Sequence, residues 1–148
     1  MKVLIGYDTK HGNTKKVAEL IGEGIKSVEK NEVTVENVKE IDLNQEKIYD
    51  LILLGSPNHG GSHTRTVKKF IKELANAQLK GKSYAVFDTY MGKDFEKVIK
   101  DMEVQVSEMI PDLIKASSGL SIKVGGMEGP IVDEDLPKCK EFGSKLAN

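Results

Sequence analysis

Short apolar runs alternate along the chain with longer segments in which apolar residues recur every three or four positions. The runs at 2–7, 51–54 and 84–87 are mostly apolar without alternation, which is typical of strands buried on both faces of a sheet. Residues 32–39 alternate roughly and predict a strand nearer an edge, and residues 120–124 predict a weaker last strand. The pattern therefore predicts five strands.

Four longer segments carry apolar residues at the spacing of one helix face. Their apolar residues run from Val17 to Val28, from Val67 to Leu74, from Phe95 to Ile110 and from Leu136 to Leu146. Residues 41–49 are weakly patterned and predict a short or broken helix. Pro111 is expected to end or kink the third helix, and the acidic residues 133–135 suit the start of the last one.

The predicted order, βαβ(α)βαβαβα, indicates an α/β fold with a parallel sheet covered by helices on both faces. Right-handed crossovers limit such a sheet to a few doubly wound strand orders. Sheets of this kind bind ligands at the carboxyl ends of their strands, beside the point where the strand order reverses. We expect a single domain over residues 1–148, with a site formed by the loops after the first, third and fourth apolar strands.

Composition narrows the possible functions. The 22 basic and 23 acidic residues balance to a net charge of −1, which argues against a nucleic-acid partner or a membrane surface. One cysteine, Cys139, cannot build a disulfide framework or a four-thiolate cluster within one chain. No apolar run approaches the roughly 18 residues of a membrane span, and no signal peptide precedes the first strand, so a cytoplasmic location is expected.

The first loop has the chemistry of an anion site. It joins a strand to a helix, and its residues offer hydroxyl, amide and backbone donors: Thr9, Lys10, His11, Gly12, Asn13 and Thr14. Neither the Walker pattern nor the dinucleotide pattern fits, because no lysine follows Gly12 and Gly6 lies too far from it. These failures favour a phosphate monoester on another ligand. An ordinary capped helix start, with Thr9 or Asn13 as the cap, is the alternative.

The second and third loops could hold a flat ring. The second is rich in glycine and follows the most apolar strand: Ser56, Pro57, Asn58, His59, Gly60, Gly61 and Ser62. The third offers an aromatic face just past a strand end: Asp88, Thr89, Tyr90, Met91 and Gly92. We expect the ring between these loops, with His59 and Tyr90 as its walls. Taken alone, Tyr90 would be read as a partly exposed surface tyrosine.

These loops together resemble those of the flavodoxins of the short-chain type. The segment Thr9-Lys10-His11-Gly12-Asn13-Thr14 is similar to the FMN phosphate loop of that family, T/S-x-T-G-x-T. The runs LILLGSP-NHGG and FDTYMG resemble its two flavin loops, and GGMEGP before an acidic helix start also has its look. The chain departs from the family in four ways: His11 replaces a hydroxyl residue, His59 stands where an aromatic residue is often found, Asp88 replaces a small residue, and strong acidity is missing.

The resemblance implies a five-stranded parallel sheet in the order 2-1-3-4-5 and a noncovalent FMN cofactor. It implies an electron carrier, with no catalytic residue, that works as a monomer with redox partner proteins. Three sets of residues are expected to bind the cofactor: Thr9, Lys10, His11, Gly12, Asn13 and Thr14; Ser56, Pro57, Asn58, His59, Gly60 and Gly61; and Asp88, Thr89, Tyr90, Met91 and Gly92. An FMN-dependent NAD(P)H:quinone oxidoreductase and a flavodoxin-like interaction domain without FMN are the alternatives.

Within this resemblance each loop has an expected role. The first holds the phosphate, with electrostatic help from Lys10 and Lys15. Tyr90 stacks on one face of the ring, and His59 or Asn58 approaches the other. A peptide at 59–60 or 60–61 turns its carbonyl toward the flavin N5–H on reduction.

Other residues have simpler expected roles. Cys139, Met102 and Met109 lie on apolar helix stripes and are expected in the core. Gly22 and Gly24 lie inside the first helix, where close packing on the sheet would explain them. His59 and His63 are four residues apart, but without a third close ligand they do not indicate a metal site.

Overall fold

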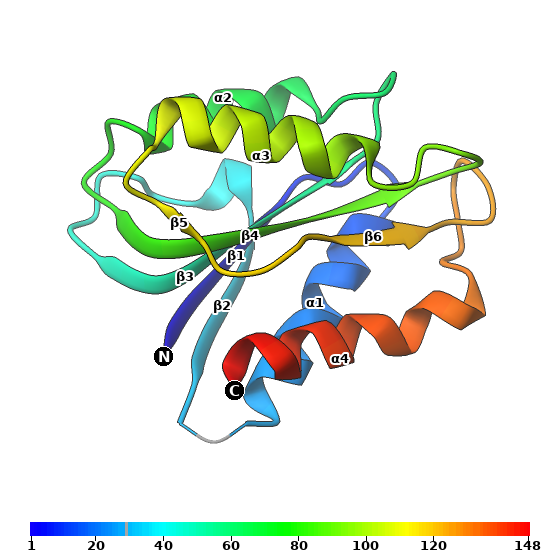
Figure 1. Cartoon of the computed structure of the whole chain (residues 1–148), viewed down its shortest axis with the longest axis horizontal. Helices are drawn as coiled ribbons and strands as arrows, with labels where there is room; N and C mark the ends of the chain where they lie inside the picture. The colour runs from blue at the N-terminus through cyan, green and yellow to red at the C-terminus, as the bar shows by residue number, and fades with distance from the viewer. Residues whose placement is uncertain (29) are drawn as a thin grey trace.

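The computed structural model describes residues 1–28 and 30–148 (Figure 1). Its strands are β1 (Lys2–Tyr7), β2 (Glu32–Asn37), β3 (Ile48–Pro57), β4 (Lys80–Tyr90), β5 (Ile114–Lys115) and β6 (Leu120–Lys123). Its α-helices are α1 (Asn13–Lys26), α2 (Arg65–Leu74), α3 (Lys97–Met109) and α4 (Leu136–Ala147). Two short 3₁₀ helices, η1 (Val38–Glu40) and η2 (Asp133–Asp135), follow β2 and precede α4.

The strands form one parallel sheet in the order β2-β1-β3-β4-β5, which confirms the predicted strand order. β5 and β6 both pair with β4, at different heights: Ser83 lies opposite Ile114, and Phe87 lies opposite Leu120. The two short strands therefore share the fifth position, and the sequence pattern had predicted only the second of them. All pairings between the strands are parallel, as the βαβ order requires.

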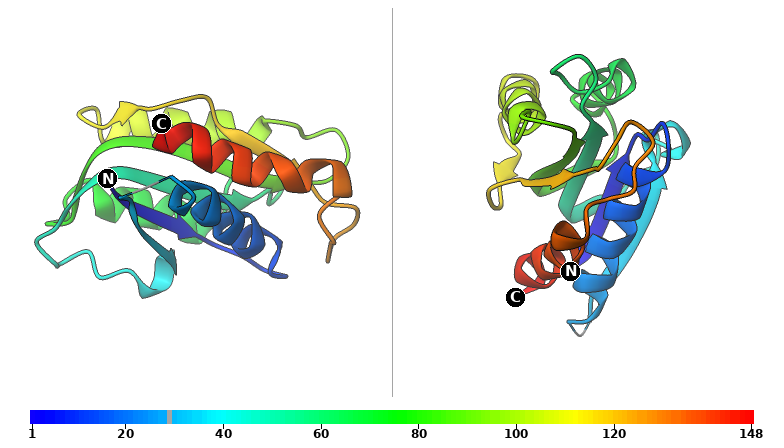
Figure 2. Two further views of the ribbon diagram at one scale, coloured as in Figure 1. Left: turned by 90° about the horizontal axis from the view of Figure 1, so that it is seen from below. Right: turned by 90° about the vertical axis from the view of Figure 1, so that its right-hand side faces the viewer.

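Helices cover both faces of the sheet, α2 and α3 on one and α1 and α4 on the other (Figures 1 and 2). Successive residues of a strand point to opposite faces, so β4 sends Tyr84 and Val86 toward α2 and α3 and sends Ala85 and Phe87 toward α1 and α4. All four are buried. This double burial explains why the central strands are apolar without alternation.

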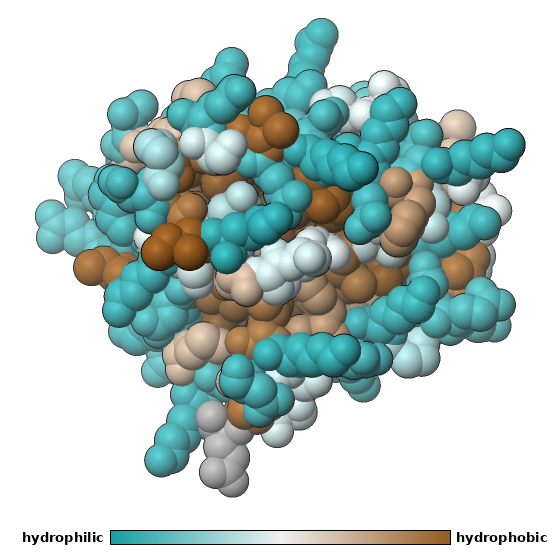
Figure 3. All heavy atoms as spheres, in the orientation of Figure 1, coloured by the Kyte–Doolittle hydropathy of each residue, from teal (hydrophilic) through white to brown (hydrophobic). Residues whose placement is uncertain are grey.

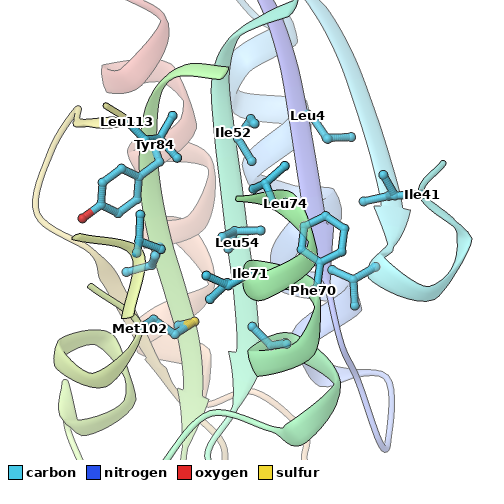
Figure 4. Packing of buried hydrophobic residues seen from close by; sticks show 14 of the residues in the cluster. Leu4, Ile41, Ile52, Leu54, Phe70, Ile71, Leu74, Tyr84, Met102 and Leu113 are labelled. Atoms are coloured by element: carbon cyan, nitrogen blue, oxygen red, sulfur yellow. The ribbon is translucent and has the colours of Figure 1, made fainter. Parts of the chain in front are cut away.

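The core on the α2 and α3 side is closed by the apolar stripe of α2. Figure 4 shows Phe70 and Ile71 of α2 lying over the strands near Leu54. Met102 of α3 completes this layer and is fully buried, as predicted. Fully burying side chains of this size stabilises the fold by about 1.5–3 kcal/mol each.

On the other face, α1 and α4 cross at glycines. A Cβ atom at Gly24 would lie 2.1 Å from the carbonyl oxygen of Lys140, and one at Gly143 would lie 2.1 Å from that of Ile21. Gly22 instead packs on the sheet, where a Cβ atom would lie 3.1 Å from the Val35 side chain. The expectation of sheet packing therefore holds for Gly22 and is wrong for Gly24, which permits the contact between helices. Cys139 of α4 is buried in this core, as predicted.

The short helix predicted over residues 41–49 is wrong. A 3₁₀ turn, η1, precedes this segment, where the Asn37 side chain accepts the backbone N–H of Lys39 (2.9 Å). The Asp42 side chain then accepts the N–H of Asn44 (2.9 Å). Such local side-chain bonds compete with helical ones. Val38 and Lys39, predicted as the end of the second strand, belong to η1.

The ends of the long third helix also differ from the prediction. α3 begins only at Lys97, so Phe95 lies before it and is 59% exposed. Met109, predicted in the core, is 39% exposed at the last residue of α3. The helix ends at Met109, two residues before Pro111, because a proline disfavours the helical conformation of the residue that precedes it.

One face of the molecule is seen in Figure 3. On the face drawn in Figure 3, hydrophilic side chains dominate, and hydrophobic atoms are visible in patches between them. Among the described residues, no helix has both the length and the apolar character needed to cross a membrane.

The glycine crossing makes a testable prediction. Gly24→Ala places a methyl group against the α4 backbone, so it is expected to lower the free energy of unfolding by about 1–3 kcal/mol despite a helix-propensity gain of about 1 kcal/mol. Gly22→Ala is the matched control, because its methyl group meets only a side chain. Urea unfolding of the three proteins measures the difference. Equal stabilities of the two variants would contradict the assigned crossing.

Candidate functional site

Three segments lie together at the carboxyl-terminal edge of the sheet, after β1, β3 and β4. The backbone N–H of Asp8 donates to the carbonyl of Gly55 (3.0 Å), and that of Asn58 donates to the carbonyl of Thr89 (2.9 Å). These bonds hold the ends of neighbouring strands side by side. β1 is also where the strand order reverses, because β2 lies on one side of it and β3 on the other. Both chain termini lie toward the opposite end of the sheet (Figure 1).

The first segment ends in a helix start without a side-chain cap. Gly12 adopts a left-handed conformation (φ 92°), and its carbonyl accepts the first helical hydrogen bond, from Lys16 (3.0 Å). The Thr9 hydroxyl oxygen accepts the N–H of Gly12 (2.9 Å) and does not cap the helix. Neither Thr9 nor Asn13 is therefore the cap that the alternative interpretation required.

The missing cap leaves backbone donors at the N-terminus of α1. Three N–H groups of its first turn find no acceptor within residues 1–28 and 30–148: those of Asn13, Thr14 and Lys15. Free N–H groups and the positive end of the helix dipole favour an anion at this position. Lys10, His11 and Lys15 extend from this turn as exposed side chains, so the two lysines place positive charge near it.

A hydroxyl pair joins the first segment to the end of β4. The Thr14 hydroxyl lies 2.9 Å from the Thr89 hydroxyl, and both residues are buried. One O–H group suffices for a bond between two hydroxyls, so the pair retains a second O–H for another acceptor. The anion end of the site is thereby fixed to the strand that carries Tyr90.

The second segment begins inside a strand. β3 extends to Pro57 and not only to Leu54, so Ser56 belongs to the sheet. Its hydroxyl is fully buried, donates to the Pro57 carbonyl (2.9 Å) and accepts the N–H of Thr64 (3.0 Å) at the start of α2. The structure therefore places Ser56 beneath the edge of the sheet, where it positions α2.

A tight turn follows at residues 58–62. Gly60 (φ 64°) and Gly61 (φ 87°) are both in the left-handed region, and His59 pairs with Ser62 across the turn. The Asn58 amide fixes its geometry by accepting the N–H of Gly61 (2.8 Å) and donating to Asp94 Oδ2 (2.9 Å). His59 is exposed. Asn58 therefore ties the second segment to the segment after β4.

His63 is buried beside this turn. Its Nε2 lies 2.6 Å from Gln105 Oε1, and Gln105 Nε2 donates to the carbonyl of Lys68 (3.0 Å). The glutamine oxygen is therefore the acceptor, which makes Nε2 of His63 the donor. Burial lowers the pKa of His63, opposed by the bond to Gln105. The described residues contain no cluster of three groups suited to a metal ion, and His63 has a structural partner that sequence spacing did not reveal.

The third segment also begins inside a strand, because β4 extends to Tyr90 and not only to Phe87. Asp88 is fully buried on the α3 side, where Oδ1 accepts the Ser121 hydroxyl (2.6 Å). Among the described residues, Oδ2 has no hydrogen-bond partner. Burial raises the pKa of Asp88 to about 7, opposed by the Ser121 bond and the nearby N–H of Ile99.

The residues after β4 are tied to this buried carboxyl. Ser121 Oγ, which donates to Asp88, also accepts the N–H of Glu96 (3.0 Å). Glu96 has a left-handed backbone (φ 61°) immediately before α3. Asp88 therefore helps to hold the segment that follows β4 in place, through its hydrogen bond to Ser121.

An aromatic pair stands at the end of β4. The ring of half-buried Tyr90 lies 5.7 Å from that of Phe95, with 58° between their planes. Burial raises the pKa of Tyr90, and Asp135 and Asp88 act in the same direction. Phe95, Met91 and Gly92 are exposed, and Gly92 has φ 65°. Together they form an apolar rim that could receive a flat ring.

The site includes residues that the sequence interpretation missed. Asp94 was assigned to no loop and Phe95 to a helix face, although they lie two and three residues after the predicted third loop. Ser121 and Gln105 are polar residues within apolar patterns, at 120–124 and along α3. A polar residue on an otherwise apolar stripe is the signal that could have revealed a buried partner.

Comparison with known proteins agrees with the fold described above. The sequence pattern of a family described as the flavodoxin domain matches residues 4–120. A flavodoxin of Clostridium beijerinckii is 30% identical over 155 residues, covering 100% of this chain and 99% of its own, and one of Aquifex aeolicus is 27% identical, covering 99% and 85%. The structure of oxidised flavodoxin 2 from Bacillus cereus superposes with a TM-score of 0.79 at 28% identity, covering 99% and 98% of the two chains.

The buried Asp88 predicts a specific dependence of stability on pH. Its pKa is about 7 in the folded chain and near 4 when unfolded, so the folded state holds more protons between these values and loses stability as the pH rises through them. Asp88→Asn removes this loss. The free energy of unfolding of Asp88→Asn minus that of the parent is expected to increase by at most about 4 kcal/mol between pH 4 and pH 7. Above pH 7 this difference is expected to stay constant.

Urea unfolding at a series of pH values measures this change. Asp112→Asn, at an exposed position, reports the same substitution without burial. A constant difference between Asp88→Asn and the parent across the pH range would show that the carboxyl is not the titrating group.

Proposed function

Because the chain belongs to the flavodoxin family, we propose that it binds FMN noncovalently at the carboxyl edge of its sheet and carries electrons between redox partner proteins. The observation that carries this proposal is the uncapped start of α1 beside the ends of β3 and β4. It combines a site for an anion with a neighbouring aromatic rim. FMN has this division, with a phosphate at one end and a flat ring at the other.

The residues present fit the phosphate of FMN. Free backbone N–H groups at Asn13 and Thr14 can donate to a phosphate oxygen, and the Thr14–Thr89 hydroxyl pair has an O–H to spare. The exposed Lys10 and Lys15 add positive charge. We assign the phosphate to these groups, with Gly12 allowing the backbone to turn close to it.

The residues at the end of β4 and in the turn after β3 fit the ring. Tyr90 offers one aromatic face, and His59 is the exposed side chain of the opposite turn. The Asn58 amide is already engaged with Gly61 and Asp94, which favours His59 over Asn58 as the second wall. Gly60 and Gly61 permit either orientation of the peptide between them, because glycine carries no Cβ atom. The cofactor supplies the redox chemistry, and these residues bind it, orient it and limit its exposure to water.

The alternatives lack comparable support. A quinone reductase of this fold is expected to carry extra loop insertions. This chain and the C. beijerinckii flavodoxin instead cover each other almost completely. An interaction domain without FMN is expected to lose the donors of the first loop, and here the N–H groups at the start of α1 have no acceptor among the described residues.

FMN binding and the phosphate assignment are tested together by fluorescence titration. The parent protein is expected to quench FMN fluorescence, to retain FMN on a desalting column and to bind FMN more tightly than riboflavin. Thr14→Val removes a hydroxyl of the buried pair. It is therefore expected to weaken the binding of FMN by roughly tenfold and the binding of riboflavin much less. Thr34→Val, the same substitution on the edge strand β2, is the matched control.

Three results would count against these assignments. A parent protein that neither quenches nor retains FMN contradicts the electron-carrier proposal. Equal weakening of FMN and riboflavin by Thr14→Val contradicts the phosphate role of the first turn. Rapid NAD(P)H oxidation with a quinone as acceptor would favour the oxidoreductase instead.

The ring assignment makes a separate prediction. Tyr90→Ala removes the aromatic face, so it is expected to shift the visible absorption bands of bound FMN and to weaken FMN and riboflavin by similar factors. Tyr90→Phe keeps the ring and is expected to retain the parent affinity. An unchanged spectrum in Tyr90→Ala would place the flavin elsewhere.

A further inference from the structure

A fourth segment, residues 125–130, lies against the first turn of α1. A Cβ atom at Gly129 would lie 2.5 Å from Oδ1 and 2.8 Å from Nδ2 of Asn13, so the glycine backbone and the asparagine amide are in direct contact. Residues 125–130 are far from Asn13 in the sequence and follow the fifth strand position. No site residue was predicted within them.

The core holds both ends of this segment in place. Val124 and Ile131 pair with each other at its base, and both side chains are buried on the α1 and α4 side. The N–H of Gly125 donates to the Pro130 carbonyl (2.8 Å), just beyond that pair. The position of the segment against α1 is therefore set by buried contacts.

The Asp135 carboxylate forms a second set of contacts that hold the chain on either side of residues 125–130. The Asp135 carboxylate accepts the N–H of Lys123 through Oδ2 (2.8 Å) and bonds Lys138 Nζ through Oδ1 (2.8 Å). Asp135 is buried at the end of η2. The end of β6 and the start of α4 are thus fastened to each other on the two sides of the segment.

The tip of the segment is largely exposed, and Gly129 in it lies against Asn13. A turn is closed by the N–H of Gly129 donating to the Gly126 carbonyl (3.0 Å), and Met127 within it is 71% exposed. Gly129 has φ 96°, where a side chain is strained in addition to colliding with Asn13. The backbone conformation therefore favours glycine at this position, and a larger residue there would displace the neighbouring Asn13 amide.

We propose that Gly129 is a positioning residue for the phosphate end of the site, because its bare backbone sets where the Asn13 side chain lies. Asn13 is the first residue of α1, and its backbone N–H is one of the groups assigned to the phosphate. This role in phosphate binding rests on the proposed function. The contact itself is a property of the protein without cofactor.

The experiment compares four variants with the parent: Gly129→Ala, Gly126→Ala, Asn13→Ala and the double variant Asn13→Ala with Gly129→Ala. Gly126→Ala adds the same methyl group to the same turn, where it would lie 3.7 Å from the Gly129 carbonyl oxygen, an ordinary contact. FMN and riboflavin affinities are measured by fluorescence quenching. The NMR resonances of the Asn13 side-chain amide are followed in the cofactor-free proteins, and thermal unfolding checks that each variant folds.

Gly129→Ala is expected to move the Asn13 amide resonances and to weaken FMN by roughly tenfold more than riboflavin, as for the loss of a hydrogen bond to a charged group. Gly126→Ala is expected to do neither. In the Asn13→Ala background, Gly129→Ala is expected to have little further effect on FMN, because the colliding amide is gone.

Three results would overturn this inference: unmoved Asn13 resonances, equal weakening of FMN and riboflavin, or an undiminished effect in the Asn13→Ala background, which would trace the loss to the strained turn. A parent protein that binds FMN no better than riboflavin overturns the phosphate assignment as well. A parent that prefers FMN, together with a Gly129→Ala variant of unchanged preference, overturns the role of Gly129 alone.

Discussion

β1, β3 and β4 are covered by helices on both faces, so their buried backbone groups have no water to bond and must bond one another. A parallel sheet meets this requirement, and its crossover helices supply the cover. The same connections send all three strands in one direction, so the segments that follow them emerge at one edge. The site therefore depends on the double burial of strands that contribute only their last residues to it.

The polar residues at this edge divide into two groups. Ser56 and Asp88 turn beneath the edge and bond neighbouring elements, at the start of α2 and at Ser121. The uncapped turn at Asn13 and the aromatic ring of Tyr90 remain available to a ligand. The buried Asp88 reduces stability at neutral pH because desolvation disfavours its charged form. It nevertheless fixes Ser121, which holds the segment after β4.

Contacts between the segments make the edge a single unit. The Thr14–Thr89 hydroxyl pair joins the anion end to β4, and Asn58 joins the turn after β3 to Asp94. Gly129, in the segment that follows β6, lies against the first turn of α1. Each contact joins residues that are more than 30 positions apart in the chain. Rearranging one segment would therefore disturb its neighbours, which favours a preorganised site over independently mobile loops.

Apolar periodicity in the sequence determined five of the six strands, the four α-helices and their order along the chain, because burial on one or two faces leaves a regular mark on residue type. The loop 9–14 likewise carried the signal of an anion site in its own residues. Tertiary structure alone decided that β3 and β4 extend into the predicted loops and that Gly24 faces α4. It also brought Gly129 against Asn13. Those outcomes depend on contacts between distant segments, which no local pattern records.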